Sequence, residues 1–226
     1  MARRPAKKEN TTIPMAKKNF HMEFLNIAQK MAFSAFEQHD VLFLLGPAGT
    51  GKTHLACAFA ISEIIAKKKK RILITRPIVE SGESLGYLPG TFEEKVHPYM
   101  LPIYDCIGKL VGYEGNERER IDKCLEKAPL AYLRGRTFDN AVAVFDEAQN
   151  ASYMQLKLFL TRMGENCKLV ITGDPKQSDL RGEVALMEVV KKLESEPGIG
   201  IVEFKSNSIV RHPLVGRILE KLEDRG

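Results

Sequence analysis

The chain of 226 residues contains no long apolar run, no internal repeat and no low-complexity tract beyond its basic N-terminal arm. A transmembrane helix needs about 20 consecutive apolar residues, and no stretch approaches that length. The positive residues at the start of the chain are not followed by the apolar segment of a secretory signal. We therefore expect a cytoplasmic protein without a membrane partner, and a content of 44% hydrophobic and 28% charged residues is typical of a globular domain.

Closely spaced cysteines are also absent, because the four thiols lie far apart and form no C-x-x-C pair. That spacing indicates neither a zinc site nor a disulfide framework. We expect reduced, partly buried thiols at Cys57, Cys106, Cys124 and Cys167.

The net charge of +5 comes entirely from residues 1–20, which hold six Lys and Arg against one Glu. The rest of the chain, 21–226, therefore sums to zero and has the length of one domain with a full hydrophobic core. We predict that the basic arm is a disordered, solvated tail. The alternative is an appendage that binds phosphates without sequence preference.

A short apolar run at 41–45 leads into a glycine-rich loop, and a helix-forming segment follows. The loop fits G-x-x-x-x-G-K-[ST], a pattern in which backbone N–H groups bind nucleotide phosphates. This order of strand, loop and helix favours a phosphate site over a turn that merely ends a strand. Lys52 would reach the β- and γ-phosphates of a nucleotide, and the Thr53 hydroxyl would bind Mg²⁺. The predicted cofactor-binding residues of the loop are Gly46, Pro47, Ala48, Gly49, Thr50, Gly51, Lys52 and Thr53.

Two acids, Asp146 and Glu147, follow a second buried strand. Asp146 is suited to hold Mg²⁺ largely through its water shell, and Glu147 is placed to polarise an attacking water as general base. A further strand ends in Thr172, Asp174 and Gln177, which can sense the γ-phosphate. These signals together predict a Mg²⁺-dependent NTPase, which the family resemblance described below narrows to ATP hydrolysis. A small-molecule kinase fits less well, because the acid pair with a glutamine sensor suits water rather than a bound acceptor.

Strand and helix patterns alternate with short links, which predicts an α/β domain with a mostly parallel sheet and helices on both faces. Five strands are predicted at 41–45, 71–77, 141–145, 168–177 with a polar end, and 199–204. Amphipathic or buried helices are predicted at 21–36, 51–66, 154–163 and 182–195. The segment 78–136 is rich in proline and glycine, shows one clear helix near 117–128, and is interpreted as an insertion.

The insertion offers a weak indication of nucleic-acid binding. Its five tyrosines could stack on bases, yet its ten acids outnumber its eight Lys and Arg, and core packing is the commoner fate of tyrosine. Arg134 and Arg136 flank a glycine just before a strand, an arrangement that can hold phosphate. The basic run 67–71 either caps the preceding helix and marks an exposed turn, or contacts nucleic acid.

Six motifs occur in the order GPAGTGKT, TRPIVESGESLGYLPG, YLRGRTF, VFDEAQN, ITGDPKQSD and VRHP. In order and spacing, over about 20–215, the chain resembles the PhoH family of ATPases, which are related to the core of superfamily 1 helicases. The resemblance implies a single RecA-like P-loop NTPase domain. It also implies that Gln177 is the γ-phosphate sensor and Arg211 the arginine finger. Gln29 resembles the glutamine that reads adenine in helicase-like ATPases, although an ordinary surface glutamine is the alternative.

The resemblance leaves two uses of ATP open. Helicase relatives close two RecA-like domains on one ATP, whereas this chain has one such domain. Arg211 would therefore complete the site of an adjacent subunit in a homo-oligomeric ring, for which a hexamer is one candidate size. The first hypothesis is a motor on single-stranded RNA or DNA, in which the segment beginning at Arg76 faces the strand. The second is an ATP-dependent oligomeric switch or scaffold that acts on a protein partner.

Overall fold

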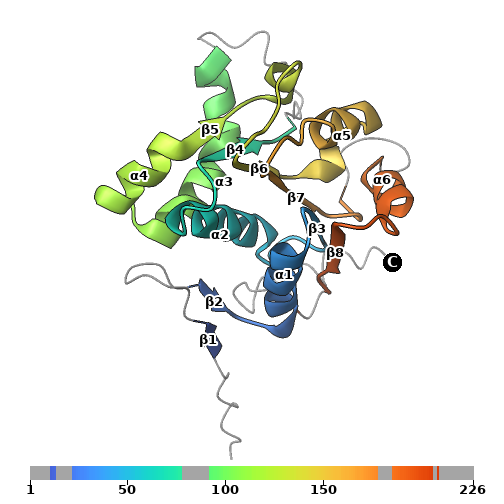
Figure 1. The fold of residues 1–226 in the computed structure, drawn as a ribbon, viewed down its shortest axis with the longest axis horizontal. Helices are drawn as coiled ribbons and strands as arrows, with labels where there is room; N and C mark the ends of the chain where they lie inside the picture. The colour runs from blue at the N-terminus through green and yellow to red at the C-terminus, as the bar shows by residue number, and fades with distance from the viewer. Residues whose placement is uncertain (1–10, 14–21, 78–91, 178–184, 206–207, 209–226) are drawn as a thin grey trace, which may run out of the picture.

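A parallel sheet of six strands lies at the centre of the computed structural model, which describes residues 11–13, 22–77, 92–177, 185–205 and 208 (Figure 1). The strand order is β5-β4-β6-β7-β3-β8, and every one of these pairs is parallel. The strands are β3 (Val41–Leu45), β4 (Arg71–Thr75), β5 (Leu125–Lys127), β6 (Ala141–Phe145), β7 (Lys168–Gly173) and β8 (Ile199–Glu203). The predicted α/β class and all five predicted strands are therefore confirmed.

The prediction of five strands misses β5. The helix expected near 117–128 is α4 (Asn116–Cys124), and the next three residues pair with β4 as an edge strand. Three residues are too few to show an alternating pattern. Pairing between Ile72 and Leu125 therefore depends on the neighbouring strand rather than on local sequence.

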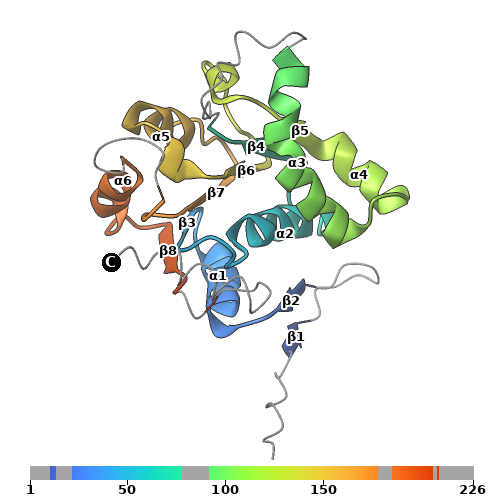
Figure 2. The same ribbon diagram turned by 180° about the vertical axis from the view of Figure 1, so that it is seen from behind.

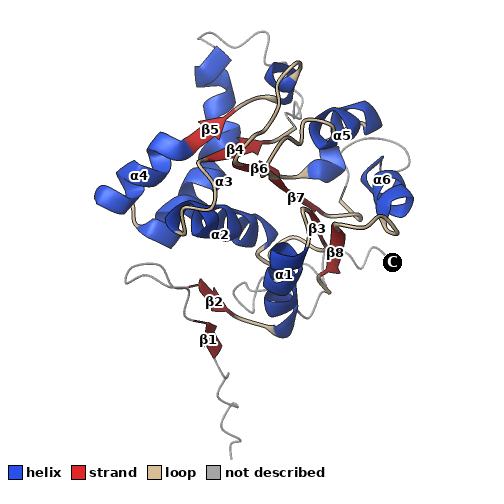
Figure 3. Ribbon diagram, viewed as in Figure 1, coloured by secondary structure: helices blue, strands red, loops and turns tan. Residues whose placement is uncertain are grey.

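Alternate side chains of the strands pack into separate cores on the two faces of the sheet, as the pleat of a strand requires. Leu42 and Leu44 face one core, which is covered by α1 (Ile27–Gln38), α2 (Lys52–Ile65), α3 (Phe92–Val111) and α4. Phe43 and Leu45 face the other, which is covered by α5 (Tyr153–Leu160) and α6 (Ala185–Leu193). Both views of the ribbon show these helix layers on opposite sides of the strands (Figures 2 and 3), which confirms the prediction of helices on both faces.

Helix α3 continues through Pro98 and Pro102, where the sequence analysis expected irregular structure. A proline inside a helix removes one backbone hydrogen bond and normally ends or kinks the helix. The burial of Met100, Ile103 and Ile107 in the core shared with α2 stabilises α3 despite that loss. Tertiary packing thus overrides the local signal.

The first helix begins later than predicted. Met22–Phe24 forms β2 and pairs antiparallel with β1 (Thr11–Ile13), so α1 starts at Ile27 rather than at residue 21. The side chain of Asn26 caps α1 by accepting a hydrogen bond of 2.9 Å from the backbone N–H of Gln29. The rest of the basic arm lies outside the described residues. Among the helices that the structure describes, none is long and apolar enough to cross a bilayer.

Phe59 of α2 offers a test of the core beneath the phosphate loop. Its ring is fully buried and stacks on Phe36 with a centroid distance of 4.8 Å. We expect Phe59→Ala to lower the free energy of unfolding by about 3–5 kcal/mol in urea denaturation. Met154→Ala in α5, where the side chain is 69% exposed, is the control and should change it by less than about 0.5 kcal/mol. Equal effects of the two substitutions would contradict the described packing.

Candidate active site

The sheet order places the candidate catalytic groups at one edge. β7 lies between β3, which leads into the phosphate loop, and β6, which leads into the acid pair. Because all three strands are parallel, their carboxyl ends meet at the same edge of the sheet. Residues far apart in sequence thereby become neighbours.

The phosphate loop has the backbone of an anion-binding turn. Gly46, Gly49 and Gly51 all have positive φ, at 141°, 83° and 88°. A Cβ atom at Gly46 would lie 2.3 Å from the backbone oxygen of Phe204, so only glycine fits against β8 and the residue that follows it. Gly51 occupies the N-cap of α2 and provides no side-chain cap. The first N–H groups of α2 can therefore bind an anion.

Two polar side chains of the loop bind its own carbonyl groups. Lys52 Nζ donates hydrogen bonds of 2.5 Å to the oxygen of Gly46 and 2.9 Å to that of Pro47. Thr50 is buried and donates to the same Pro47 oxygen at 2.9 Å. These contacts hold the lysine ammonium against the loop that the sequence predicts to bind phosphate.

Asp146 is the point where three elements meet. Its Oδ1 accepts hydrogen bonds from Thr53 Oγ1 of α2, at 2.7 Å, and from Thr172 Oγ1 of β7, at 2.6 Å. Its Oδ2 is buried and has no hydrogen-bond partner within the described part of the chain. A hydroxyl oxygen beside a buried carboxylate oxygen that lacks a donor fits the oxygen ligands that Mg²⁺ prefers.

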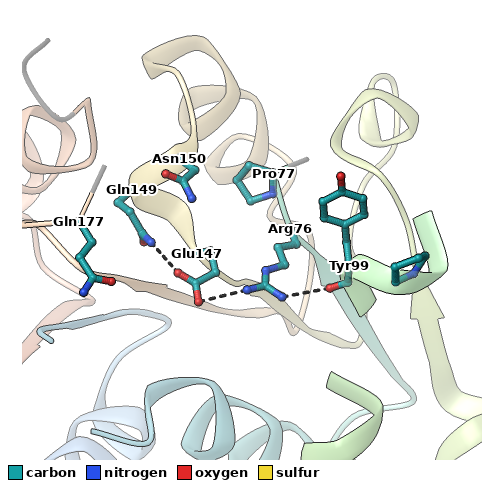
Figure 4. Close-up of a pocket in the computed structure, with 8 residues that line it drawn as sticks. Arg76, Pro77, Tyr99, Glu147, Gln149, Asn150 and Gln177 are labelled. Carbon is teal, nitrogen blue, oxygen red and sulfur yellow. Dashed lines mark hydrogen bonds and ion pairs between the residues drawn. The ribbon is translucent and has the colours of Figure 1, made fainter. Parts of the chain in front are cut away.

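Glu147 lies next in the chain and is held at both carboxylate oxygens (Figure 4). Its Oε1 accepts from Arg76 Nη2 at 3.2 Å, and its Oε2 accepts from Gln149 Nε2 at 2.5 Å. Gln149 also accepts a hydrogen bond of 3.0 Å from the backbone N–H of Asp174. The backbone of Glu147 has φ of 55°, a left-handed conformation that is uncommon in residues other than glycine.

Arg76 lies at the acid pair, although the sequence analysis considered it only as a nucleic-acid residue. Its Nε is 3.7 Å from Asp146 Oδ2, and its Nη1 donates to the backbone oxygen of Tyr99 at 3.0 Å. The contact of Gln149 with Glu147 is a further feature that was not predicted, and its only signal in the sequence is the place of Gln149 in the VFDEAQN motif. The contact of Arg76 with the acids requires β4 and β6 to pair, whereas Gln149 and Glu147 are two residues apart in the segment that follows β6.

Gln177 reaches the same region through a turn. The carboxylate of Asp174 accepts a hydrogen bond from the backbone N–H of Lys176 at 3.0 Å, as in an Asx-turn, and Gln177 then lines a cavity with Glu147 (Figure 4). The structure thus places Gln177 at the same cavity as Glu147, and its role as γ-phosphate sensor stays a prediction. Arg211 lies outside the described residues, so its role as arginine finger stays a prediction.

Gln29 is buried behind the phosphate loop, with only 4% of its surface exposed. Its Nε2 donates to the backbone oxygen of Thr50 at 3.3 Å, and its Oε1 accepts from the N–H of Leu25 at 2.8 Å. It is therefore not a surface glutamine, and in the structure it braces the loop. Contact with adenine stays a prediction.

Arg134 and Arg136 are not brought to the acid pair. Arg134 is exposed beyond a short 3₁₀ helix (Leu130–Leu133), and Arg136 forms an ion pair with Glu126 of β5. That pair raises the pKa of Arg136 and lowers the pKa of Glu126. In the basic run 67–71, Lys69 is buried and donates to the backbone oxygen of Asn166 at 2.9 Å, which is a structural role.

The burial of Asp146 predicts a pH-dependent stability. Burial, and secondly the charge of Glu147, raise the pKa of Asp146 even though Thr172, Arg76 and Thr53 act in the opposite direction. The folded chain therefore binds this proton more tightly than the unfolded chain. The contribution of Asp146 to stability consequently falls as pH rises from the ordinary carboxyl pKa through the raised folded pKa, and it stays low above that.

We expect Asp146→Asn, which keeps the accepting oxygen, to raise the Tm at neutral pH by a few degrees in metal-free buffer. For a chain of this size, 1 kcal/mol corresponds to roughly 2–4 °C. The gain should shrink as pH is lowered through the folded pKa of Asp146, which thermal melts across the acidic range would measure. An unchanged Tm at neutral pH would mean that the hydrogen bonds compensate the buried charge in full.

The fold and these loops define a P-loop NTPase domain with a parallel sheet. The family model described as PhoH-like protein matches residues 21–223, and the chain belongs to this family. The chain is 45% identical over 196 residues to the PhoH-like protein of Bacillus subtilis (strain 168), covering 86% of this chain and 61% of that protein. It is 42% identical over 199 residues to Protein PhoH of Escherichia coli (strain K12), covering 86% of this chain and 56% of that protein.

The chain thus spans about three fifths of the length of these relatives. Among solved structures, the large terminase from a thermophilic bacteriophage matches with a TM-score of 0.50 and 12% identity, over 88% of this chain and 50% of that one. At that identity the match concerns the fold alone. The predicted family and fold class are confirmed.

Proposed function

We propose that this chain binds ATP with Mg²⁺ and hydrolyses it. The observation that carries the proposal is the meeting of Thr53 and Thr172 on one oxygen of Asp146, with Glu147 next in the chain. A phosphate loop joined in this way to an acid pair has the parts that phosphoryl transfer to water requires.

The site contains a candidate group for phosphate binding, for Mg²⁺ binding and for activation of the attacking water. Loop N–H groups and Lys52 would hold the β- and γ-phosphates, and Thr53 with Asp146 would hold Mg²⁺, which neutralises phosphate charge when bound. Glu147 would take the proton of a water that attacks the γ-phosphorus in line, and the bond to the departing ADP breaks. Gln177, which lines the cavity beside Glu147, is suited to orient that water.

Phosphate release from ATP with Mg²⁺ tests this proposal. We expect Glu147→Gln to lower kcat by about 10²–10⁴-fold, the usual contribution of a general base. Lys52→Ala should remove nucleotide binding as well, because its ammonium is the loop's charged ligand. Glu188→Gln, on the exposed side of α6, is the matched control and should hydrolyse ATP like the parent chain. Equal rates in all four proteins would refute the assignment.

We propose further that hydrolysis is coupled to single-stranded nucleic acid, with RNA as the first candidate. A cavity of about 370 Å³ lies beside Glu147. Arginine binds phosphate, amides hydrogen-bond base edges and aromatic rings stack on bases. Side chains of these kinds line the cavity: Arg76, Tyr99, Gln149, Asn150 and Gln177.

The coupling predicts that single-stranded RNA raises the steady-state rate of phosphate release several-fold over the rate without nucleic acid. Single-stranded DNA is measured in parallel, with Glu147→Gln as the blank. Hydrolysis that responds to neither strand would contradict the motor and favour the second function.

That second function is an ATP-dependent oligomeric switch or scaffold, and an exposed apolar group at α1 favours it. Ile27 and Met31 lie four residues apart on one helix face and are 75% and 59% exposed, and Leu25 is close by in sequence. Light scattering with and without nucleotide tests whether copies of the chain assemble. A monomer in every state would remove both the ring and the role of Arg211 across a subunit boundary.

A further inference from the structure

The general base is restrained in the structure. A carboxylate that takes a proton from water needs an oxygen directed at that water. Each oxygen of Glu147 accepts a hydrogen bond from a neighbouring side chain, Arg76 at 3.2 Å and Gln149 at 2.5 Å, and these two bonds fix the direction in which the carboxylate points (Figure 4). The two donors differ in how they are anchored.

Gln149 belongs to the site itself. It lies two residues after Glu147, is buried, and accepts a backbone hydrogen bond from Asp174. Arg76 follows another strand and is 71 residues distant in sequence from Glu147. Its guanidinium contacts both acids and a carbonyl of α3, yet the side chain keeps 19% of its surface exposed.

The exposed part of Arg76 faces a place where an anion can compete. Arg76 and Glu147 both line the cavity of about 370 Å³, so a group bound there lies within reach of the ion pair. A guanidinium can form two parallel hydrogen bonds with a phosphate, whereas Arg76 forms a single hydrogen bond of 3.2 Å with Glu147, beside its contacts with Asp146 and the Tyr99 carbonyl. A phosphodiester in the cavity would therefore draw Arg76 away from the carboxylate.

We propose that Arg76 is a positioning residue that restrains Glu147 until a phosphodiester of single-stranded nucleic acid in this cavity takes over its guanidinium. The inference deepens the proposed function and rests on it, because it assigns the coupling between strand and hydrolysis to one ion pair. Since Glu147 and the phosphodiester compete for one cation, each weakens the binding of the other by the same factor.

Hydrolysis gives the first test. We expect Arg76→Ala to raise kcat without nucleic acid about 10-fold, to leave KM for ATP within about 2-fold, and to lose stimulation by RNA. Arg76→Lys keeps the positive charge but lacks the planar guanidinium. Its kcat without nucleic acid and its stimulation by RNA should therefore lie between those of the parent chain and those of Arg76→Ala. Arg118→Ala on α4, where the arginine pairs with Asp122, is the control and should match the parent chain. A kcat of Arg76→Ala as low as that of Glu147→Gln would overturn the proposal, as would stimulation that persists.

Binding gives the second test, which does not require hydrolysis. The chain has no tryptophan, so Tyr99→Trp places a single fluorophore at the cavity. Without ATP, a short oligouridylate should bind about 10-fold tighter after Glu147→Gln, because Glu147 is the nearer of the two carboxylates that compete for Arg76, and should lose binding after Arg76→Ala. An unchanged Kd in Glu147→Gln, or no fluorescence response in any variant, would overturn the proposal. If the Kd values change as expected but the chain does not hydrolyse ATP, the competition between Glu147 and the oligouridylate for Arg76 stands and only the proposed ATPase activity is wrong.

Discussion

The structure depends on one buried carboxylate oxygen. Oδ1 of Asp146 accepts hydroxyl hydrogen bonds from α2 and from β7, and so joins the phosphate loop, the acid pair and the strand between them. Burial of a charge is unfavourable unless donors compensate it, and the raised pKa of Asp146 shows that compensation is incomplete. A carboxylate with a buried oxygen that lacks a donor is poorly suited to a purely structural role, which agrees with the proposed role of Asp146 in binding Mg²⁺.

Two hydrophobic cores give that carboxylate its fixed surroundings. Alternate residues of β3 and β6 pack against α1 to α4 on one face and against α5 and α6 on the other, so the strand ends cannot shift independently. At β8 the backbone of Gly46 lies so close to Phe204 that a side chain would not fit, which sets the entry of the phosphate loop. Gln29 braces the far end of the loop through the carbonyl of Thr50.

A second set of contacts connects this site to the cavity beside it. Glu147 lies between a glutamine of its own loop and the arginine that follows β4, and the arginine in turn contacts the backbone of α3. The helix that receives this contact belongs to the segment inserted between β4 and β6, which also supplies the edge strand β5. The insertion therefore contributes a backbone carbonyl to Arg76 and the side chain of Tyr99 to the cavity, whereas Arg134 and Arg136 near its end lie away from the acid pair.

The sequence by itself determined those parts of this protein that are formed by residues adjacent in the chain. The phosphate loop, the acid pair and five strands were predicted because each is a short pattern of adjacent residues with a local physical meaning. The strand β5 could not be predicted because pairing with β4 stabilises it. The proline-containing helix α3 could not be predicted because burial against α2 stabilises it. The partners of Asp146 and Glu147 that come from other strands and helices were likewise decided by tertiary structure. Thr53 and Arg76 lie 93 and 71 residues from them in sequence, and only the order of the parallel strands brings such distant side chains within hydrogen-bond range.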